Sequence, residues 1–119
     1  EEIIKLLKDI GRRTYNVVYK ALERLPIPFV NIPDNITAPA IGLNNFRKYC
    51  LPLYKELVEM MDFKKIPVVV HMDGDIKPLW EAIGESEIFG IDSFSPPPDT
   101  GRAMLECKER LSRLIKNFN

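Results

Sequence analysis

Apolar and polar positions alternate along the chain with two different periods, which predict helices and strands in turn. From residue 1 to 25 the apolar side chains recur at spacings of three and four, the period of an amphipathic helix, until Pro26 and Pro28 end the pattern. The run IPVVVHM, residues 66–72, has three consecutive β-branched residues after a proline boundary and predicts a strand that is buried on both faces. Helix and strand patterns then follow one another to the end of the chain.

The remaining segments complete this alternating order. We expect a strand over 27–33, a polar turn over 34–42, a helix over 43–63 that Pro52 kinks or breaks, a helix over 75–87, a strand over 88–94, a rigid loop over 95–101 and a final helix over 101–118. In the helix over 43–63 the predicted apolar face consists of Phe46, Tyr49, Cys50, Leu53, Leu57, Met60 and Met61. Trp80 is expected to pack in the core.

This order predicts an α/β fold of repeated right-handed βα units around a parallel sheet. A chain of 119 residues fits one domain, so we expect a single unit over 1–119. Three to four βα units are few for an open doubly wound sheet and about half of a (β/α)8 barrel, which needs roughly 250 residues. The expected architecture is therefore a partial barrel. The chain begins inside a helix without a methionine, and we expect it to be a piece of a longer protein.

Charge and composition narrow the functional classes. The 17 basic and 17 acidic residues cancel and are interspersed, which argues against a nucleic acid or membrane surface as the partner. No apolar run approaches the roughly 20 residues of a membrane span, and no signal peptide is recognisable, so a cytoplasmic protein is expected. Cys50 and Cys107 are far apart and are expected to be reduced thiols.

Polar residues follow each predicted strand at its carboxyl end, where parallel α/β proteins bind ligands. His71 and Asp73 are two residues apart, so both side chains lie on one face if the chain is extended there. The candidate site consists of His71, Asp73 and Asp34 as catalytic residues, with Asn35, Asp75, Asp92 and Ser93 as substrate-binding residues. A structural alternative stays open for each: Asp75 can cap the next helix, and Asp34 with Asn35 can form an Asx-turn.

Four segments together resemble the uroporphyrinogen decarboxylase superfamily, and especially its members related to corrinoid-dependent methyltransferases. They are VNIPDNIT (30–37), YCLPLYKELVEM (49–60), PVVVHMDGDIKPLWEAIGES (67–86) and GIDSFSPPPDT (90–100). The resemblance implies a (β/α)8 barrel with its site at the carboxyl ends of the strands. It implies either cofactor-free decarboxylation of a tetrapyrrole or zinc-dependent methyl transfer from a corrinoid protein to a thiol such as coenzyme M.

The match to the methyltransferase zinc motif, H-x-C on one strand and a later cysteine, is incomplete. His71 matches the histidine, Asp73 stands in place of the cysteine, and Asp34 or Asp92 would have to complete a zinc site. The arginines that bind substrate in the decarboxylases have no counterpart, since Arg12 and Arg13 lie in a helix. Three hypotheses remain: decarboxylation, methyl transfer with a corrinoid partner, and an inactive partial barrel or subunit that completes a site only on association, as a homo-oligomer or part of a longer chain.

Overall fold

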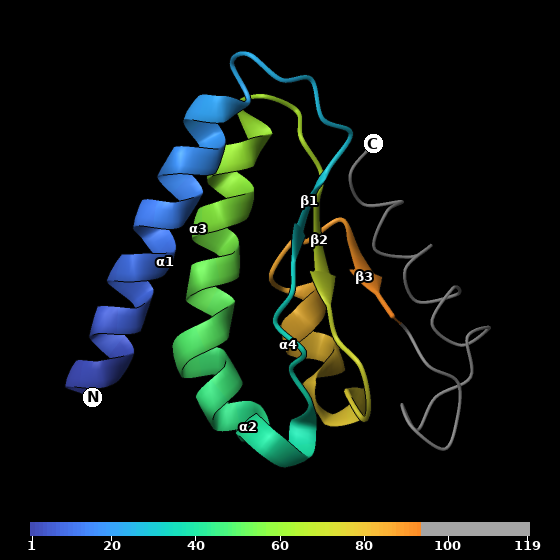
Figure 1. The fold of residues 1–119 in the computed structure, drawn as a ribbon. Coiled ribbons are helices and arrows are strands. Elements are labelled where there is room, and N and C mark those ends of the chain that lie inside the picture. The colour runs from blue at the N-terminus through green and yellow to red at the C-terminus, as the bar shows by residue number, and fades with distance from the viewer. Residues whose placement is uncertain (94–119) are drawn as a thin grey trace.

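A parallel three-stranded sheet forms the centre of the molecule in the computed structural model, which describes residues 1–93 (Figure 1). Its strands are β1 (Val30–Ile32), β2 (Val68–His71) and β3 (Gly90–Asp92), in the spatial order β1-β2-β3. Each strand is followed or preceded by a helix, so neighbouring strands are joined by crossovers. The predicted α/β fold with parallel strands is confirmed, and the architecture is that of a partial (β/α)8 barrel.

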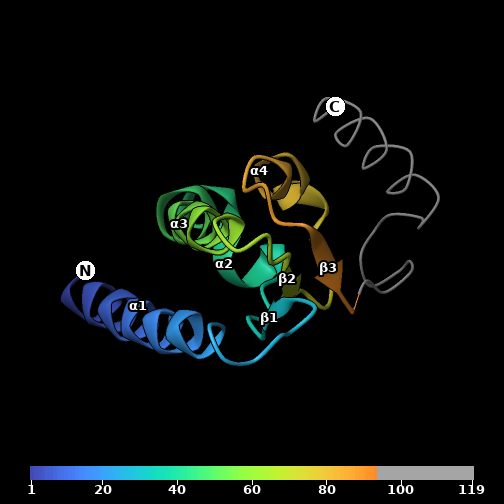
Figure 2. The ribbon, with the colours of Figure 1, turned by 90° about the horizontal axis from the view of Figure 1, so that it is seen from above.

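Helices cover one face of this sheet. They are α1 (Glu2–Ala21), α2 (Ala38–Asn45), a π-helix η1 (Phe46–Cys50), α3 (Leu51–Asp62), a 3-10 turn η2 (Lys77–Leu79) and α4 (Trp80–Gly84). Figure 2 shows α3 and α4 on one side of the strands and no helix of the described residues on the other. No helix in residues 1–93 combines the length and apolar character that crossing a membrane requires.

The core lies between the sheet and α3 and α4. Val68 and Val70 of β2 are buried, and they alternate with the less buried Val69 and His71. Ile32 joins the valines from β1, and Trp80 lies in the same buried cluster, as predicted. Burying these aliphatic and aromatic side chains removes apolar surface from water, at roughly 25 cal/mol per Å². It fixes which face of each strand points toward the helices.

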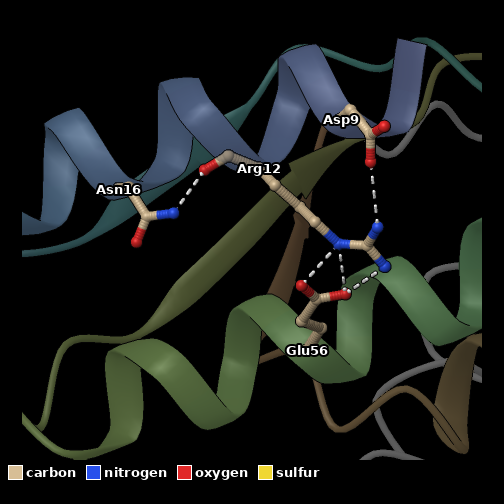
Figure 3. Close-up of polar contacts among 4 residues, drawn as sticks. All are labelled: Asp9, Arg12, Asn16 and Glu56. Carbon is tan, nitrogen blue, oxygen red and sulfur yellow. Dashed lines mark hydrogen bonds and ion pairs between the residues drawn. The ribbon is translucent and has the colours of Figure 1, made fainter. Parts of the chain in front are cut away.

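Helix α1 is attached to the core by only one of its sides. Tyr15, Val18 and Leu22 pack against the core, yet no residue of α1 is fully buried. The Arg12 guanidinium donates from Nε and Nη2 to both carboxylate oxygens of Glu56 on α3, at 2.7 to 3.0 Å (Figure 3). The helix ends at Ala21, so the predicted end at residue 25 was four residues too late.

The segment around Pro39 differs from its prediction as a polar turn. Helix α2 begins at Ala38, because Pro39 occupies the first turn of a helix, where its missing N–H costs no hydrogen bond. The π-helix then follows directly, ahead of Pro52 in the first turn of α3. The helical path is also interrupted at Gly42, whose φ of 70° and ψ of 155° are not helical. The helix predicted from residue 43 therefore begins after this kink, the break close to Pro52 is as expected, and what the prediction missed is the short helical piece that starts at Ala38.

The apolar face predicted for this helix was wrong in part. Phe46, Leu57 and Met61 are buried as predicted, and Cys50 and Met60 are partly buried and pack against the core. Leu51 and Tyr54 are buried although they were not predicted, whereas Tyr49 and Leu53 are only partly buried. The spacing of five residues between Phe46 and Leu51 matches the wider turn of a π-helix, which brings Leu51 onto the buried face. The predicted loop over 95–101, the helix over 101–118 and Cys107 lie outside the described residues.

Candidate functional site

The strand register places a group of polar side chains on the face of the sheet opposite the helices. Asn31 of β1 pairs with Val69 of β2, Val69 pairs in turn with Gly90 of β3, and His71 pairs with Asp92. Partners in a parallel register point to the same side, and successive residues of a strand alternate between sides. Asn31, Val69, Gly90, His71 and Asp92 therefore share one face, which we call the open face.

Three of these side chains form a hydrogen-bonded group at the carboxyl ends of the strands. The Asn31 amide donates from Nδ2 to Asp92 Oδ2 at 3.0 Å, and His71 Nδ1 lies 3.4 Å from the same oxygen. Each of β1, β2 and β3 contributes one member. The Met72 backbone N–H also donates to the Asp92 carbonyl at 3.2 Å, which fixes the end of β3 beside the end of β2.

The charge of Asp92 determines how His71 bonds to it. The hydrogen bonds from Asn31 and then from His71 lower the pKa of the Asp92 carboxyl, so it is ionised at neutral pH. An ionised carboxylate can only accept a hydrogen bond, so Nδ1 of His71 carries the proton between them. Nε2 of the neutral imidazole then has a free lone pair, available to accept a proton or bind a ligand.

Asp73 and Ser93 flank this group in sequence. Burial alternates beyond the end of β2, since Met72 is fully buried and Asp73 is exposed, which is the pattern expected if Asp73 follows His71 on the open face. Ser93 comes directly after Asp92 in a left-handed conformation, with a φ of 62°. The roles predicted for both residues stay predictions.

Asp34, by contrast, belongs to a second group on the helix side. Its Oδ2 accepts a hydrogen bond of 2.7 Å from the hydroxyl of Tyr54 on α3. Tyr54 is fully buried, and its burial and the Asp34 charge raise the pKa of the phenol far above its ordinary value. The Asp34 carboxylate is therefore bonded to the helix side through Tyr54, whereas the sequence predicted it beside His71.

The turns after β1 and β2 are locked together near the site. The Ala38 N–H donates to the Asp75 carbonyl at 2.7 Å, and Asp75 Oδ1 accepts the Lys77 N–H at 3.0 Å. The Asp75 carboxylate thus bonds to the backbone two residues on, in the manner of an Asx-turn, while the N-cap position of the 3-10 turn is Ile76 rather than Asp75. Gly74 has a φ of +100°, and a Cβ placed on it would lie 3.0 Å from Thr37 Cγ2. Asn35 is exposed, with a φ of 39°, in the turn after β1.

Asn31 was missed by the sequence analysis. It interrupts the apolar run FVNIP, and a polar residue inside a buried strand is a signal that its side chain faces a polar surface. Its partner Asp92 lies two strands away, and only the register reveals that pairing. Tyr54 was missed for a different reason, because the π-helix ahead of α3 has no signal in the sequence.

The metal site predicted from His71 and Asp73 lacks a third ligand in residues 1–93. In that part of the chain no three histidine, cysteine, aspartate or glutamate side chains lie close enough together to hold a metal ion. Zinc needs three or four such ligands. Cys50, a free thiol, is half-buried, and burial and then the Asp34 charge raise its pKa to about 11, which keeps it protonated at neutral pH. The described residues alone do not fit a zinc centre.

A separate hollow of about 260 Å³ opens at the other end of the sheet, at the amino ends of β2 and β3. It is lined by Val58, Asp62, Lys65, Ile66, Pro67, Val68, Glu87 and Phe89. This hollow contains none of the candidate site residues. In parallel α/β folds the amino end of the sheet carries stability rather than chemistry.

Comparison with known protein families agrees with this geometry. The family model described as Uroporphyrinogen decarboxylase (URO-D) matches residues 27–112, which is well over half of the chain and includes all three strands. Searches of curated proteins and of solved structures found no match. This family has the (β/α)8 barrel fold, of which the described residues form a part. The chain belongs to the uroporphyrinogen decarboxylase family.

Proposed function

We propose that this chain is part of an enzyme that acts on a tetrapyrrole or corrinoid-linked substrate and binds it at the open face of the sheet. The observation that carries the proposal is the Asp92 carboxylate, held ionised and half-exposed between the Asn31 amide and the His71 imidazole. Tetrapyrroles present pyrrole N–H donors and acidic side chains. An oriented, ionised carboxylate accepts hydrogen bonds from the pyrrole N–H groups, and a histidine can exchange protons with the acidic side chains.

Decarboxylation is the chemistry that these residues support best. Protonation of a pyrrole ring creates a positive charge, and an anionic carboxylate beside the ring N–H stabilises it. The bond between the acetate methylene and its carboxylate then breaks, its electron pair enters the ring system, and carbon dioxide leaves. A proton finally converts the methylene into a methyl group. Asp92 suits the role of charge stabiliser, and Nε2 of His71 suits that of proton carrier.

Methyl transfer from a corrinoid protein is the less supported chemistry. Its zinc would need ligands in addition to His71, and residues 1–93 provide no set of three. A corrinoid protein would be the methyl donor, and therefore the partner of this chain, only if methyl transfer is the reaction. We derive no step through zinc from the described residues.

The third hypothesis, that a working site forms only on association, is compatible with either chemistry. A closed barrel needs eight strands, and the described residues supply three, with β1 and β3 as the outer strands. Further strands from a longer chain or from another subunit would close the barrel and cover the open face. We propose that substrate turnover depends on them, whereas the Asn31, His71 and Asp92 group is intrinsic to this chain.

An anaerobic assay with uroporphyrinogen tests the proposal. The chain, within the longer protein or assembly that closes the barrel, is incubated with the reduced porphyrin, and loss of carboxyl groups is followed by chromatography of the reoxidised products. Binding to the chain alone is followed by fluorescence titration with uroporphyrin. His71→Ala and Asp92→Asn are expected to weaken binding about tenfold or more, since each removes a group that faces the ligand. Asp62→Asn is the matched control, because it removes an exposed carboxylate beside the hollow at the other end of the sheet.

Three outcomes separate the hypotheses. Carboxyl loss that persists after treatment with a chelator supports decarboxylation. Dependence on added zinc, with methylation of coenzyme M by a methylcorrinoid, supports methyl transfer instead. If the His71→Ala and Asp92→Asn variants bind uroporphyrin as strongly as the Asp62→Asn control does, the open face is not the site.

A further inference from the structure

Asp34 carries a negative charge at the carboxyl end of the sheet that the proposed reaction does not use. It comes two residues after Ile32, the last residue of β1, and it is exposed. Among the ion pairs of residues 1–93, none includes Asp34. Its charge acts on its neighbours instead, since it contributes to the raised pKa values of Cys50 and Tyr54. A ligand that reaches this end of the sheet therefore meets a carboxylate that no cation of the described residues neutralises.

Tyr54 holds this carboxylate in place. The Tyr54 hydroxyl donates to Asp34 Oδ2 at 2.7 Å, and the Tyr54 ring is fully buried, in an edge-to-face contact with Phe46 at a centroid distance of 6.0 Å. Breaking this hydrogen bond would leave a buried hydroxyl without a partner, which costs free energy. One oxygen of Asp34 is thus anchored from the helix side, so the carboxylate is kept from turning away when a ligand approaches.

Asp34 lies beside the proposed site rather than within it. The turn that carries Asp34 is joined to the turn after β2 by the hydrogen bond from the Ala38 N–H to the Asp75 carbonyl, at 2.7 Å. In Figure 1 both turns lie at the end of the sheet where α2 lies. The hydrogen-bonded group around Asp92 is on the open face at the same end, whereas the bond to Tyr54 places Asp34 on the helix side of β1. A ligand centred on Asp92 therefore reaches Asp34 only with its periphery.

The periphery of the proposed ligand is the part that carries its negative charges. A tetrapyrrole has its N–H groups at the centre of the macrocycle and its acidic side chains around the rim. When the N–H groups bond to Asp92, a rim side chain that extends across β1 comes toward Asp34. Two carboxylates repel each other there, so an acidic side chain in that direction weakens binding, whereas an uncharged one does not.

We infer that Asp34 is a specificity-determining residue, with Tyr54 as its positioning residue, that keeps acidic side chains of the ligand away from the β1 side of the site. The ligand then binds with an uncharged part of its rim toward β1 and with its acidic side chains directed elsewhere. This inference rests on the proposed function, because it takes the tetrapyrrole to be centred on Asp92.

A comparison of two porphyrins, each bound to the full chain, tests the inference. Uroporphyrin carries acetate and propionate groups, whereas coproporphyrin carries methyl groups in place of the acetates. The ratio of the uroporphyrin to the coproporphyrin dissociation constant, from fluorescence titrations, measures the penalty for the additional negative charges. Asp34→Asn is expected to lower this ratio about threefold at low salt, the size of one charge–charge repulsion near a protein surface. The change is expected to shrink at high salt, because ions screen the repulsion.

Two further variants control this measurement. Asp62→Asn is the matched control, because it removes the same charge beside the hollow at the other end of the sheet and should leave the ratio unchanged. Tyr54→Phe releases Asp34 but keeps its charge, so it is expected to lower the ratio by a smaller factor than Asp34→Asn and to add nothing to it in the double variant. A purely structural role of Tyr54 would change both dissociation constants together and leave their ratio as it was. Circular dichroism verifies that each variant is folded.

The outcomes distinguish failure of this inference from failure of the proposed function. If His71→Ala and Asp92→Asn weaken the binding of both porphyrins but Asp34→Asn leaves the ratio unchanged, the inference is wrong and the proposed function stands. A higher ratio in Asp34→Asn would also overturn it, because Asp34 would then attract the ligand. If neither porphyrin binds, or if His71→Ala and Asp92→Asn bind both as strongly as the unchanged chain, the proposed function fails and this inference fails with it.

Discussion

At the scale of single residues, the candidate site depends on one carboxylate oxygen. Asp92 Oδ2 accepts the hydrogen bond from Asn31 and lies beside His71 Nδ1, so one atom connects residues from all three strands. The two bonds favour the ionised form of Asp92. Because the pKa of Asp92 is lower in the folded than in the unfolded protein, its ionisation stabilises the fold at pH values above the unfolded-state pKa. This stabilisation is lost as the pH falls through the folded-state pKa.

Replacing Asn31 with alanine tests this arrangement. Since the Asn31 hydrogen bond is the largest cause that lowers the Asp92 pKa, Asn31→Ala is expected to raise that pKa toward the ordinary value for aspartate. The pH titration of the Asp92 carboxyl ¹³C chemical shift measures it directly. An unchanged titration midpoint would mean that the Asn31 amide does not bond to Asp92 in solution. Asn16→Ala is a suitable control, because the Asn16 amide donates to the Arg12 carbonyl within α1.

Cys50 gives a second prediction at this scale. Burial and the Asp34 charge raise its pKa to about 11, so only about 0.1% of the thiol is ionised at pH 8. We expect slow alkylation by iodoacetamide at pH 8, with a rate that rises about tenfold per pH unit until the pH approaches 11. Mass spectrometry of the Cys50 peptide separates its reaction from that of Cys107. Fast alkylation at pH 8 would contradict the burial of this thiol.

At the scale of elements, the sequence predicts regular patterns better than their interruptions. The valines of β2 and the period of α1 identified both elements, because each pattern depends on neighbours close in sequence. Pro39 was interpreted as part of a turn, since a proline alone does not distinguish a turn from the first turn of a helix. The π-helix has no such signal in the sequence, so the burial of Leu51 and Tyr54 was not predicted.

The same difference between local and distant neighbours explains which parts of the candidate site could be predicted from the sequence. His71 and Asp92 were identifiable as polar residues at the ends of apolar runs. Their pairing, and the inclusion of Asn31, depend on the register of strands that lie tens of residues apart. Asp34 lies at a strand end like the others, but its carboxylate is bonded to Tyr54, a partner that only helix packing could reveal.

Gly74 is the position where the turn between β2 and α4 is most restricted. Gly74→Ala is expected to destabilise the fold by roughly 1 to 3 kcal/mol, because alanine is strained at a φ of +100° and its methyl group would approach Thr37 Cγ2. Urea denaturation measures the change in the free energy of unfolding. Gly90→Ala is the matched control, since a Cβ there meets no atom within 4 Å. Equal losses in the two variants would show that the turn tolerates a side chain.

At the scale of the whole molecule, stability is distributed unevenly. The sheet, α3 and α4 share one buried cluster, whereas α1 contributes only partly buried side chains to it. Elements with few buried contacts open locally at lower free energy than the core. The part of the molecule that carries Asn31, His71 and Asp92 is therefore built on the more stable elements.

Hydrogen exchange of the backbone amides tests this difference. The amides of α1 are expected to exchange faster than those of α3. Arg12→Gln should accelerate exchange in α1 several-fold and leave α3 nearly unchanged, because it removes the two-oxygen contact with Glu56 that joins the helices (Figure 3). Arg47→Gln is the matched control, since it removes a similar contact with Glu85, which does not involve α1. Equal acceleration in α1 and α3 would mean that the two helices open as one unit, and the uneven distribution of stability would then be wrong.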